Sequence, residues 1–260
     1  MYELLKMDNR YLCGLDAEEI SELIKAGGFT HAHAVIVAGL LYKKGSSALE
    51  KSTRIPKRLK NYLPEVSQTG ISLPVRSEGS ADGTIKYLFE SPDGMKFESV
   101  YIPDEKRKTV CVSTQSGCRM GCPFCVTGRY GFHGNLSTGD IVSQVISLQN
   151  NGKVTHVVFM GMGEPMDNLD NVLKACRILI AEWGMAISPV NITVSSVGIT
   201  PAIKEFLEKS DCNLALSLYS PFHEERKIVR PGNRPAVGRR LRLRQGQGPR
   251  SEGTEGLAAE

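Results

Sequence analysis

The second half of the chain alternates short apolar runs with helical segments, and this pattern limits the possible folds more than any other feature. It predicts strands at 109–114, 155–160, 191–195 and 214–218, with helical segments between them at about 138–149, 168–182 and 201–209. Strands that alternate with helices form a parallel sheet, which helices cover on at least one face. The sequence therefore predicts an α/β fold.

The loops that follow these strands contain the segments most typical of a functional site. They are Cys118–Cys125, Gly161–Pro165, Ser195–Gly198 and Ser217–Ser220. The carboxyl ends of parallel strands share one edge of the sheet, and ligands bind there. We therefore expect the four segments to meet on one rim and to form one site.

Three cysteines, Cys118, Cys122 and Cys125, lie within the stretch CRMGCPFC. Their spacing would also fit one helix face, but Gly117 and Pro123 disfavour a helix and favour a loop that curls around an object. Thiolates on one short loop suit a soft metal or an iron–sulfur cluster. Three ligands leave one iron of a four-iron cluster open for a substrate or cofactor.

Two other interpretations of these cysteines remain open from the residues alone. A structural zinc site needs a fourth ligand, which Cys111 or His133 could provide. A disulfide with a spare thiol needs an oxidising compartment, and nothing else in the sequence indicates one. Seven cysteines without a secretion signal indicate a reducing cytoplasm instead.

Composition and charge exclude some classes of protein. No apolar stretch is long enough to span a membrane, so we expect a cytoplasmic protein without membrane contact. The net charge is +4, but residues 231–260 hold six arginines and three glutamates and supply +3 of it. A general basic field for nucleic acid is therefore absent, and only local patches remain. Residues 231–260 contain few large apolar residues and are expected to be disordered.

The first half of the chain predicts a small helical region. Asp16 and Glu19 have capping-box spacing at the start of an amphipathic helix over 16–25, and a second helix is expected at 31–44. The segment 50–60 carries five cations, which suit either a solvated helix face or a phosphate-binding patch.

A β-hairpin is expected between the helical region and the α/β segment. Residues 84–90 and 95–102 alternate polar and apolar side chains around the turn Ser-Pro-Asp-Gly.

The spacing of the three cysteines resembles the cluster motif of the radical S-adenosylmethionine (SAM) superfamily. The stretches CVSTQSGCRMGCPFCVTGRYGFHGNLS, FMGMGEP, TVSSVGITPAI and LALSLYSP resemble the RlmN/Cfr family, which methylates C2 or C8 of an adenine in 23S ribosomal RNA. The likeness runs from about residue 10 to about residue 233, and GMGEP is similar to RlmN rather than to Cfr.

The resemblance implies a partial parallel (β/α) radical SAM barrel, preceded by a small helical domain and a β-hairpin. The implied domains are 1–68 (helical, a candidate for RNA contact), 69–103 (hairpin linker), 104–230 (radical SAM core, an incomplete barrel) and 231–260 (a tail unlike the family).

The resemblance also implies which residues bind the cofactors. Cys118, Cys122 and Cys125 match the ligands of a 4Fe–4S cluster whose open iron binds SAM. The residues that match SAM contacts are Gly163, Glu164, Ser195, Ser217, Leu218 and Tyr219. The Glu164 carboxylate would accept from the ammonium of SAM, although Gly-Glu-Pro alone would suit an ordinary turn. Tyr219 stands where the family usually has histidine.

Two further residues match catalytic positions of the family. Glu98 matches the proton acceptor, and Cys111 matches the cysteine that resolves the product through a transient disulfide. Without the resemblance, Glu98 would be an exposed strand carboxylate and Cys111 a buried strand thiol. Cys13, Cys176 and Cys212 match nothing in the family and are expected to be core thiols.

The implied activity is methylation of an RNA adenine carbon, with C2 favoured, through a 5′-deoxyadenosyl radical made from SAM. The implied partners of this monomer are ribosomal RNA, transfer RNA as a second candidate, and an electron donor such as flavodoxin. The family first methylates a cysteine near its own C-terminus. No cysteine follows Cys212 here, so we expect the 260-residue chain not to complete methylation. The alternative is a non-catalytic iron–sulfur or zinc protein that binds RNA.

Overall fold

The computed structural model describes residues 11–149, 152–220, 222 and 225. Its N-terminal helices are α1 (Ala17–Lys25), α2 (His31–Lys44), α3 (Ser47–Lys51) and α4 (Lys57–Val66). The expected capping box is present, because the Asp16 carboxylate accepts the Glu19 N–H while Glu19 accepts the Asp16 N–H. The expected helices at 16–25 and 31–44 are confirmed to within a residue.

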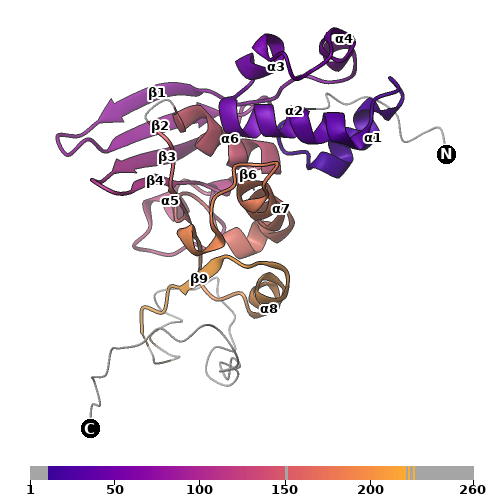
Figure 1. The fold of residues 1–260 in the computed structure, drawn as a ribbon. Helices are drawn as coiled ribbons and strands as arrows, with labels where there is room; N and C mark the ends of the chain where they lie inside the picture. The colour runs from indigo at the N-terminus through magenta and orange to yellow at the C-terminus, as the bar shows by residue number, and fades with distance from the viewer. Residues whose placement is uncertain (1–10, 150–151, 221, 223–224, 226–260) are drawn as a thin grey trace.

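Seven strands form the main sheet, which Figure 1 shows beside the N-terminal helices. They are β1 (Pro74–Gly79), β2 (Ile85–Glu90), β3 (Lys96–Pro103), β4 (Lys108–Cys111), β7 (His156–Phe159), β8 (Ile192–Ser196) and β9 (Asn213–Leu216). Their spatial order is β1-β2-β3-β4-β7-β8-β9. The four strands from β4 to β9 pair in parallel, as the sequence predicts, whereas β1 to β4 pair antiparallel. The hairpin β2–β3 is thus continuous with the parallel strands, and β1 is an addition that the sequence did not predict.

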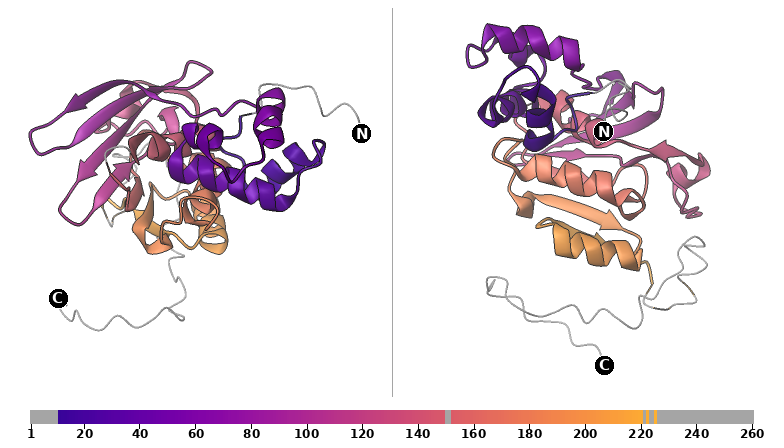
Figure 2. Two further views of the ribbon diagram at one scale, coloured as in Figure 1. Left: turned by 45° about the horizontal axis from the view of Figure 1, so that its top comes forward. Right: turned by 90° about the vertical axis from the view of Figure 1, so that its right-hand side faces the viewer.

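Helices α6 (Thr138–Leu148), α7 (Leu169–Ile180) and α8 (Thr200–Lys209) connect the parallel strands. The right-hand view of Figure 2 shows α7 and α8 side by side, with a strand of the sheet between them in that projection. The short elements η3 (Pro165–Asn168) and η4 (Pro189–Asn191) precede α7 and β8. The strands β5 (Gln115–Gly117) and β6 (Phe132–Asn135) form a separate two-stranded sheet. The short helix α5 (Val126–Arg129) lies between these two strands in the sequence. None of the helices in the described ranges is both long and apolar enough to cross a membrane.

The two faces of the main sheet differ in burial. Phe97, Val110, Val157 and Val194 point to one face and are fully buried in the core. The residues that alternate with them are only partly buried and share the opposite face, because the register pairs Val100 with Cys111, Cys111 with Val158 and Val158 with Thr193. Glu98 and Ser195 lie two residues along from members of this row and therefore point to the same face. We call it the open face.

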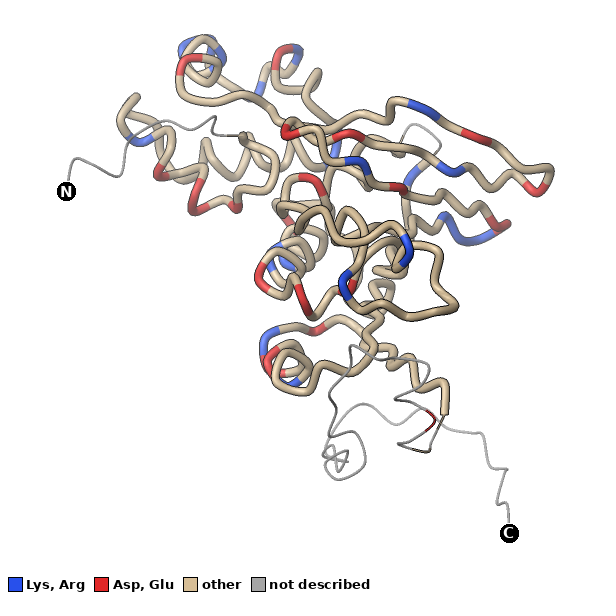
Figure 3. Tube along the Cα trace, turned by 180° about the vertical axis from the view of Figure 1, so that it is seen from behind, with Lys and Arg blue, Asp and Glu red and all other residues tan. Residues whose placement is uncertain are grey.

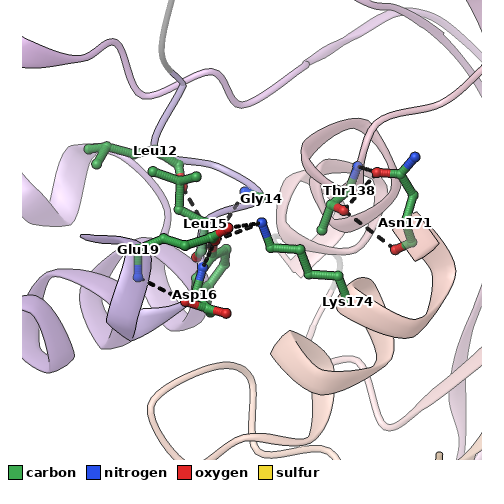
Figure 4. A network of polar contacts seen from close by, with 9 residues as sticks. Leu12, Gly14, Leu15, Asp16, Glu19, Thr138, Asn171 and Lys174 are labelled. Atoms are coloured by element: carbon green, nitrogen blue, oxygen red, sulfur yellow. Dashed lines mark hydrogen bonds and ion pairs between the residues drawn. The ribbon is translucent and has the colours of Figure 1, made fainter. Parts of the chain in front are cut away.

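The N-terminal helices are joined to the core by polar and apolar contacts (Figure 4). Lys174 of α7 lies 2.6 Å from the Glu19 carboxylate of α1 and so links the core to the N-terminal helices. Within the core, Thr138 of α6 donates to Asn171 of α7. Residues of α1 and α2 belong to the same hydrophobic cluster as the sheet and α6. The boundary at residue 68 therefore stays a prediction, and the expected disordered segment 231–260 lies outside the described residues.

Candidate functional site

The cysteine loop, residues 118–125, connects β5 to α5 and is not helical. Gly117 precedes it with a φ of +77°, and a Cβ at Gly117 would lie 1.8 Å from the Gly131 carbonyl oxygen. The Cys118 N–H donates to the same oxygen at 2.8 Å, and the Cys125 N–H donates to the Cys122 carbonyl at 3.0 Å. The expectation of a curled loop is therefore confirmed, since α5 begins only after Cys125.

The thiols of this loop affect one another electrostatically. The pKa of Cys118 is raised to about 11, mainly by burial and further by the charges of Glu164, Cys122 and Cys125, while the Met120 N–H opposes the rise. Cys118 is thus within electrostatic reach of both the other thiols and the carboxylate of the next loop. An unpaired thiolate is costly in such a place, and a bound cation would remove that cost.

The three thiols of the cysteine loop are soft donors of the kind that bind iron–sulfur clusters and soft metal ions. Among the described residues, no group of three or more His, Cys, Asp or Glu side chains lies close enough together to hold a single ion. Thiolates that bind different irons of a cluster are held apart by the cluster itself, so three soft donors on one curled loop fit that larger group.

The two candidates for a fourth zinc ligand, His133 and Cys111, each hydrogen-bond to backbone outside residues 118–125. The His133 ring hydrogen-bonds the Tyr130 carbonyl at 3.0 Å. Cys111 lies on β4 and accepts from the Met160 N–H, and its pKa is raised by burial. A structural zinc site therefore gains no support from these two residues.

The Glu164 loop, residues 160–164, follows β7 and lies against the segment that leads into the cysteine loop. Gly163 has a φ of +97°, and a Cβ there would lie 2.6 Å from the Gln115 Cβ. Glu164 is 2 % exposed, and its carboxylate accepts from the N–H groups of Met166 (3.1 Å) and Val197 (2.9 Å). This buried carboxylate therefore ties together the loops that follow β7 and β8.

The segments after β8 and β9 join the same rim. Ser195 and Ser217 place their hydroxyl oxygens 3.3 Å apart. Tyr219 has a φ of +62°, which is unusual for a residue with a side chain, and its ring stacks on Phe124 of the cysteine loop with 4.3 Å between centroids. Leu218, which lies between Ser217 and Tyr219 in the sequence, is exposed. The segments after β7, β8 and β9 follow parallel strands on the same edge of the main sheet. The cysteine loop follows β5 of the separate sheet and reaches this rim through the Phe124–Tyr219 ring contact.

Glu98 and Cys111 lie on the open face rather than in these loops. Glu98 is partly exposed, and its carboxylate pairs with Lys86 Nζ at 3.2 Å. Cys111 is a free thiol, as are all seven cysteines, so the expected disulfide of Cys111 is not supported. Cys111 forms no disulfide here because its sulfur accepts a hydrogen bond from the Met160 N–H instead of contacting another cysteine. Cys13, Cys176 and Cys212 are buried, as expected of core thiols.

The sequence did not identify three residues that organise the rim. Gln115, Arg119 and Asp167 form a connected set of hydrogen bonds and ion pairs between the cysteine loop and the Glu164 loop. Their residue types carry no recognisable motif, and only the knowledge that the two loops touch could have identified them.

The basic segment 50–60 is partly committed to internal contacts. Arg58 donates to the Gly27 carbonyl and lies over the Phe29 ring, and Lys60 donates to the Glu50 carbonyl. Figure 3 shows cations and carboxylates intermixed along the chain. These two contacts favour a structural role for Arg58 and Lys60.

Comparison with known proteins assigns the class. Residues 112–241 match the Radical SAM superfamily, and the chain belongs to this superfamily. Its relatives carry a more specific name. "Probable dual-specificity RNA methyltransferase RlmN" of Phocaeicola vulgatus is 43% identical over 223 residues, which cover 86% of this chain and 64% of the relative. "Dual-specificity RNA methyltransferase RlmN" of Geobacter sulfurreducens is 39% identical over 221 residues, which cover 85% of this chain and 61% of the relative.

A solved structure supports the same class. A radical SAM methyltransferase from Sphaerobacter thermophilus superposes with a TM-score of 0.79 at 34% identity, and the match covers 85% of this chain and 67% of that chain. The expected partial radical SAM fold is thereby confirmed. The chain spans 64% and 61% of the two curated relatives named above.

Proposed function

We propose that this protein is an RNA methyltransferase of the RlmN type that uses radical SAM chemistry on C2 of an adenine in 23S ribosomal RNA. The observation that carries the proposal is the packing of the cysteine loop and the segment before it against the Glu164 loop, which follows the parallel strand β7. The carboxyl edge of parallel strands is where such folds bind ligands. The superfamily of the chain and the names of its relatives give the reaction class.

In this proposal Cys118, Cys122 and Cys125 hold three irons of a 4Fe–4S cluster and leave the fourth iron to SAM. When bound, the cluster supplies the electron that cleaves SAM and so generates a radical. The chain keeps the loop curled through Gly117 and the Gly131 carbonyl, and in the proposal all three sulfurs of this loop bind the one cluster.

The SAM-binding residues of the proposal are Gly163, Glu164, Ser195, Ser217, Leu218 and Tyr219. Gly163 brings the backbone close to Gln115 of β5, just before the cysteine loop, and Glu164 offers carboxylate lone pairs to an ammonium group. The paired hydroxyls of Ser195 and Ser217 offer donors, and the stacked rings of Tyr219 and Phe124 bring the last segment to the cysteine loop.

Glu98 is the proposed proton acceptor. It lies on the open face beside Lys86, and its partial exposure leaves it accessible to a nucleotide. The adenine must leave its stack to enter the site, which suits a locally open RNA.

Several partners follow from the same proposal. Transfer RNA is a second substrate, a flavodoxin-like protein donates electrons, and the protein acts as a monomer in the cytoplasm. Residues 1–68 would contact RNA. Within segment 50–60, Arg58 and Lys60 form internal contacts, so Lys51 and Lys57 are the candidates for phosphate contacts.

The test supplies labelled SAM, a reductant and protein-free 23S ribosomal RNA to the anaerobically reconstituted protein. We expect formation of 5′-deoxyadenosine, and any methylated product should be 2-methyladenosine. A full cluster that never cleaves SAM would contradict the radical mechanism and favour the non-catalytic alternative, and 8-methyladenosine would contradict the assignment of C2.

A further inference from the structure

The cysteine loop and the Glu164 loop come from different strands, yet side chains join them. Asp167, three residues after Glu164, has an oxygen that accepts from Arg119 Nε at 2.8 Å and from Gln115 Nε2 at 2.8 Å. Gln115 also accepts the Glu164 N–H at 3.0 Å. Arg119 directly follows Cys118 in the chain. Arg119, Asp167 and Gln115 therefore connect the residue next to Cys118 with the backbone of Glu164 through polar contacts.

The guanidinium of Arg119 is also held from a second side. Its Cζ lies 3.9 Å from the centroid of the Phe132 ring on β6. The planar guanidinium can stack on a ring while its edge binds a carboxylate, which lysine cannot do equally well. The Asp167 side chain is 22% exposed and the Arg119 side chain 49%, so the pair is partly shielded from water on its carboxylate side.

We propose that Arg119 and Asp167 are positioning residues that fix the cysteine loop on the Glu164 loop, so that the Cys118 thiol and the Glu164 carboxylate keep a constant separation. This inference rests on the proposed function, in which SAM contacts the metal centre at one loop and Glu164 at the other. A ligand that bridges two loops binds more tightly when both are already in place. Small displacements of such loops cost much of the rate.

The first experiment measures amide hydrogen exchange in the cluster-free 260-residue chain. Arg119→Ala should accelerate exchange about 5-fold to 10-fold in the cysteine loop and also in residues 163–167, which Arg119 contacts only through Asp167. Asp167→Asn keeps the size of the side chain but loses the charge, and it should produce the same effect. The double variant should add little to either single variant, because both remove the same interaction.

Arg129→Ala is the matched control. Arg129 lies in α5 and donates to the carbonyl of Pro123 in the cysteine loop at 3.4 Å, rather than to Asp167. It should leave exchange in residues 163–167 unchanged. The proposal is overturned if Arg119→Ala accelerates exchange in the cysteine loop alone, or if Asp167→Asn has no effect on that loop.

The second experiment measures SAM affinity after anaerobic reconstitution of the cluster. Arg119→Ala and Asp167→Asn should retain the iron content of the wild type but bind SAM about 5-fold to 10-fold more weakly, which a purely stabilising ion pair would not cause. Equal SAM affinity at equal iron content would overturn the positioning role. If the wild type assembles no cluster, the proposed function fails, and hydrogen exchange still decides whether the pair fixes the loops.

Discussion

The surroundings of the buried Cys13 thiol make the stability of the protein depend on pH. Its thiol donates to the Gly139 carbonyl at 3.5 Å and lies 3.4 Å from the Ser143 hydroxyl, and burial raises its pKa to about 12. The unfolded chain would release this proton above about pH 8.5, where the folded chain retains it. Stability from Cys13 is therefore complete below about pH 8.5 and is lost as the pH rises towards 12.

We predict that the free energy of unfolding falls more steeply with pH in the wild type than in Cys13→Ala between pH 8.5 and 10.5. The difference in slope should reach at most about 1.4 kcal/mol per pH unit, which corresponds to one proton. Urea denaturation at several pH values, in the presence of a reductant, measures both slopes. Parallel curves would mean that Cys13 titrates alike in the folded and unfolded states.

At the scale of elements, the β5–β6 pair determines the shape of the cysteine loop. Gly117 needs both a positive φ and the space that a Cβ would take from the Gly131 carbonyl. Gly121, in the same loop, has a φ of +62° but nothing within 4 Å of the position of its Cβ. A side chain at Gly121 would meet backbone strain alone, whereas a side chain at Gly117 would meet both backbone strain and a steric clash.

We predict that Gly121→Ala costs about 1 kcal/mol of stability, from the left-handed backbone alone. Gly117→Ala should cost about 2 kcal/mol or more, because β5 and β6 must also separate. It should lower the iron content after reconstitution as well, whereas Gly121→Ala should not. Thermal unfolding and iron analysis of both variants test this, and equal losses in the two would contradict the role given to the Gly131 contact.

At the scale of the whole molecule, one hydrophobic cluster includes residues of the N-terminal helices, the sheet and the helices that cover it. Trp183, the single tryptophan of the sequence, lies with its ring centroid 6.2 Å from that of Tyr42 in α2. Its fluorescence therefore reports on the contact between the N-terminal helices and the core.

We predict that Trp183 fluorescence and far-UV circular dichroism follow one unfolding transition. Leu41 of α2 is fully buried, and Leu41→Ala should destabilise the protein by about 2–5 kcal/mol and shift both signals together. If residues 1–68 unfolded independently, the fluorescence change would occur first, and the variant would shift that signal alone.

The sequence predicted the parallel strands because strand periodicity is a local property, and strand-end geometry indicated the edge on which the loops after β7, β8 and β9 lie. It did not predict β1, whose side chains are almost all exposed, because an edge strand without buried residues lacks alternating hydrophobicity. It also did not predict the contacts of Gln115, Arg119 and Asp167. These contacts depend on the close approach of Gly163 to Gln115, which arises only when two distant loops pack together.

The central claim is that the cysteine loop holds a four-iron cluster with an iron open to SAM. The most direct measurement is the EPR spectrum of the anaerobically reconstituted and reduced protein before and after addition of SAM. We predict the signal of a reduced four-iron cluster, a clear change on addition of SAM, and loss of the signal when Cys118, Cys122 and Cys125 are all replaced by alanine. A cluster that persists in the triple variant, or a wild-type signal that SAM leaves unchanged, would contradict the claim.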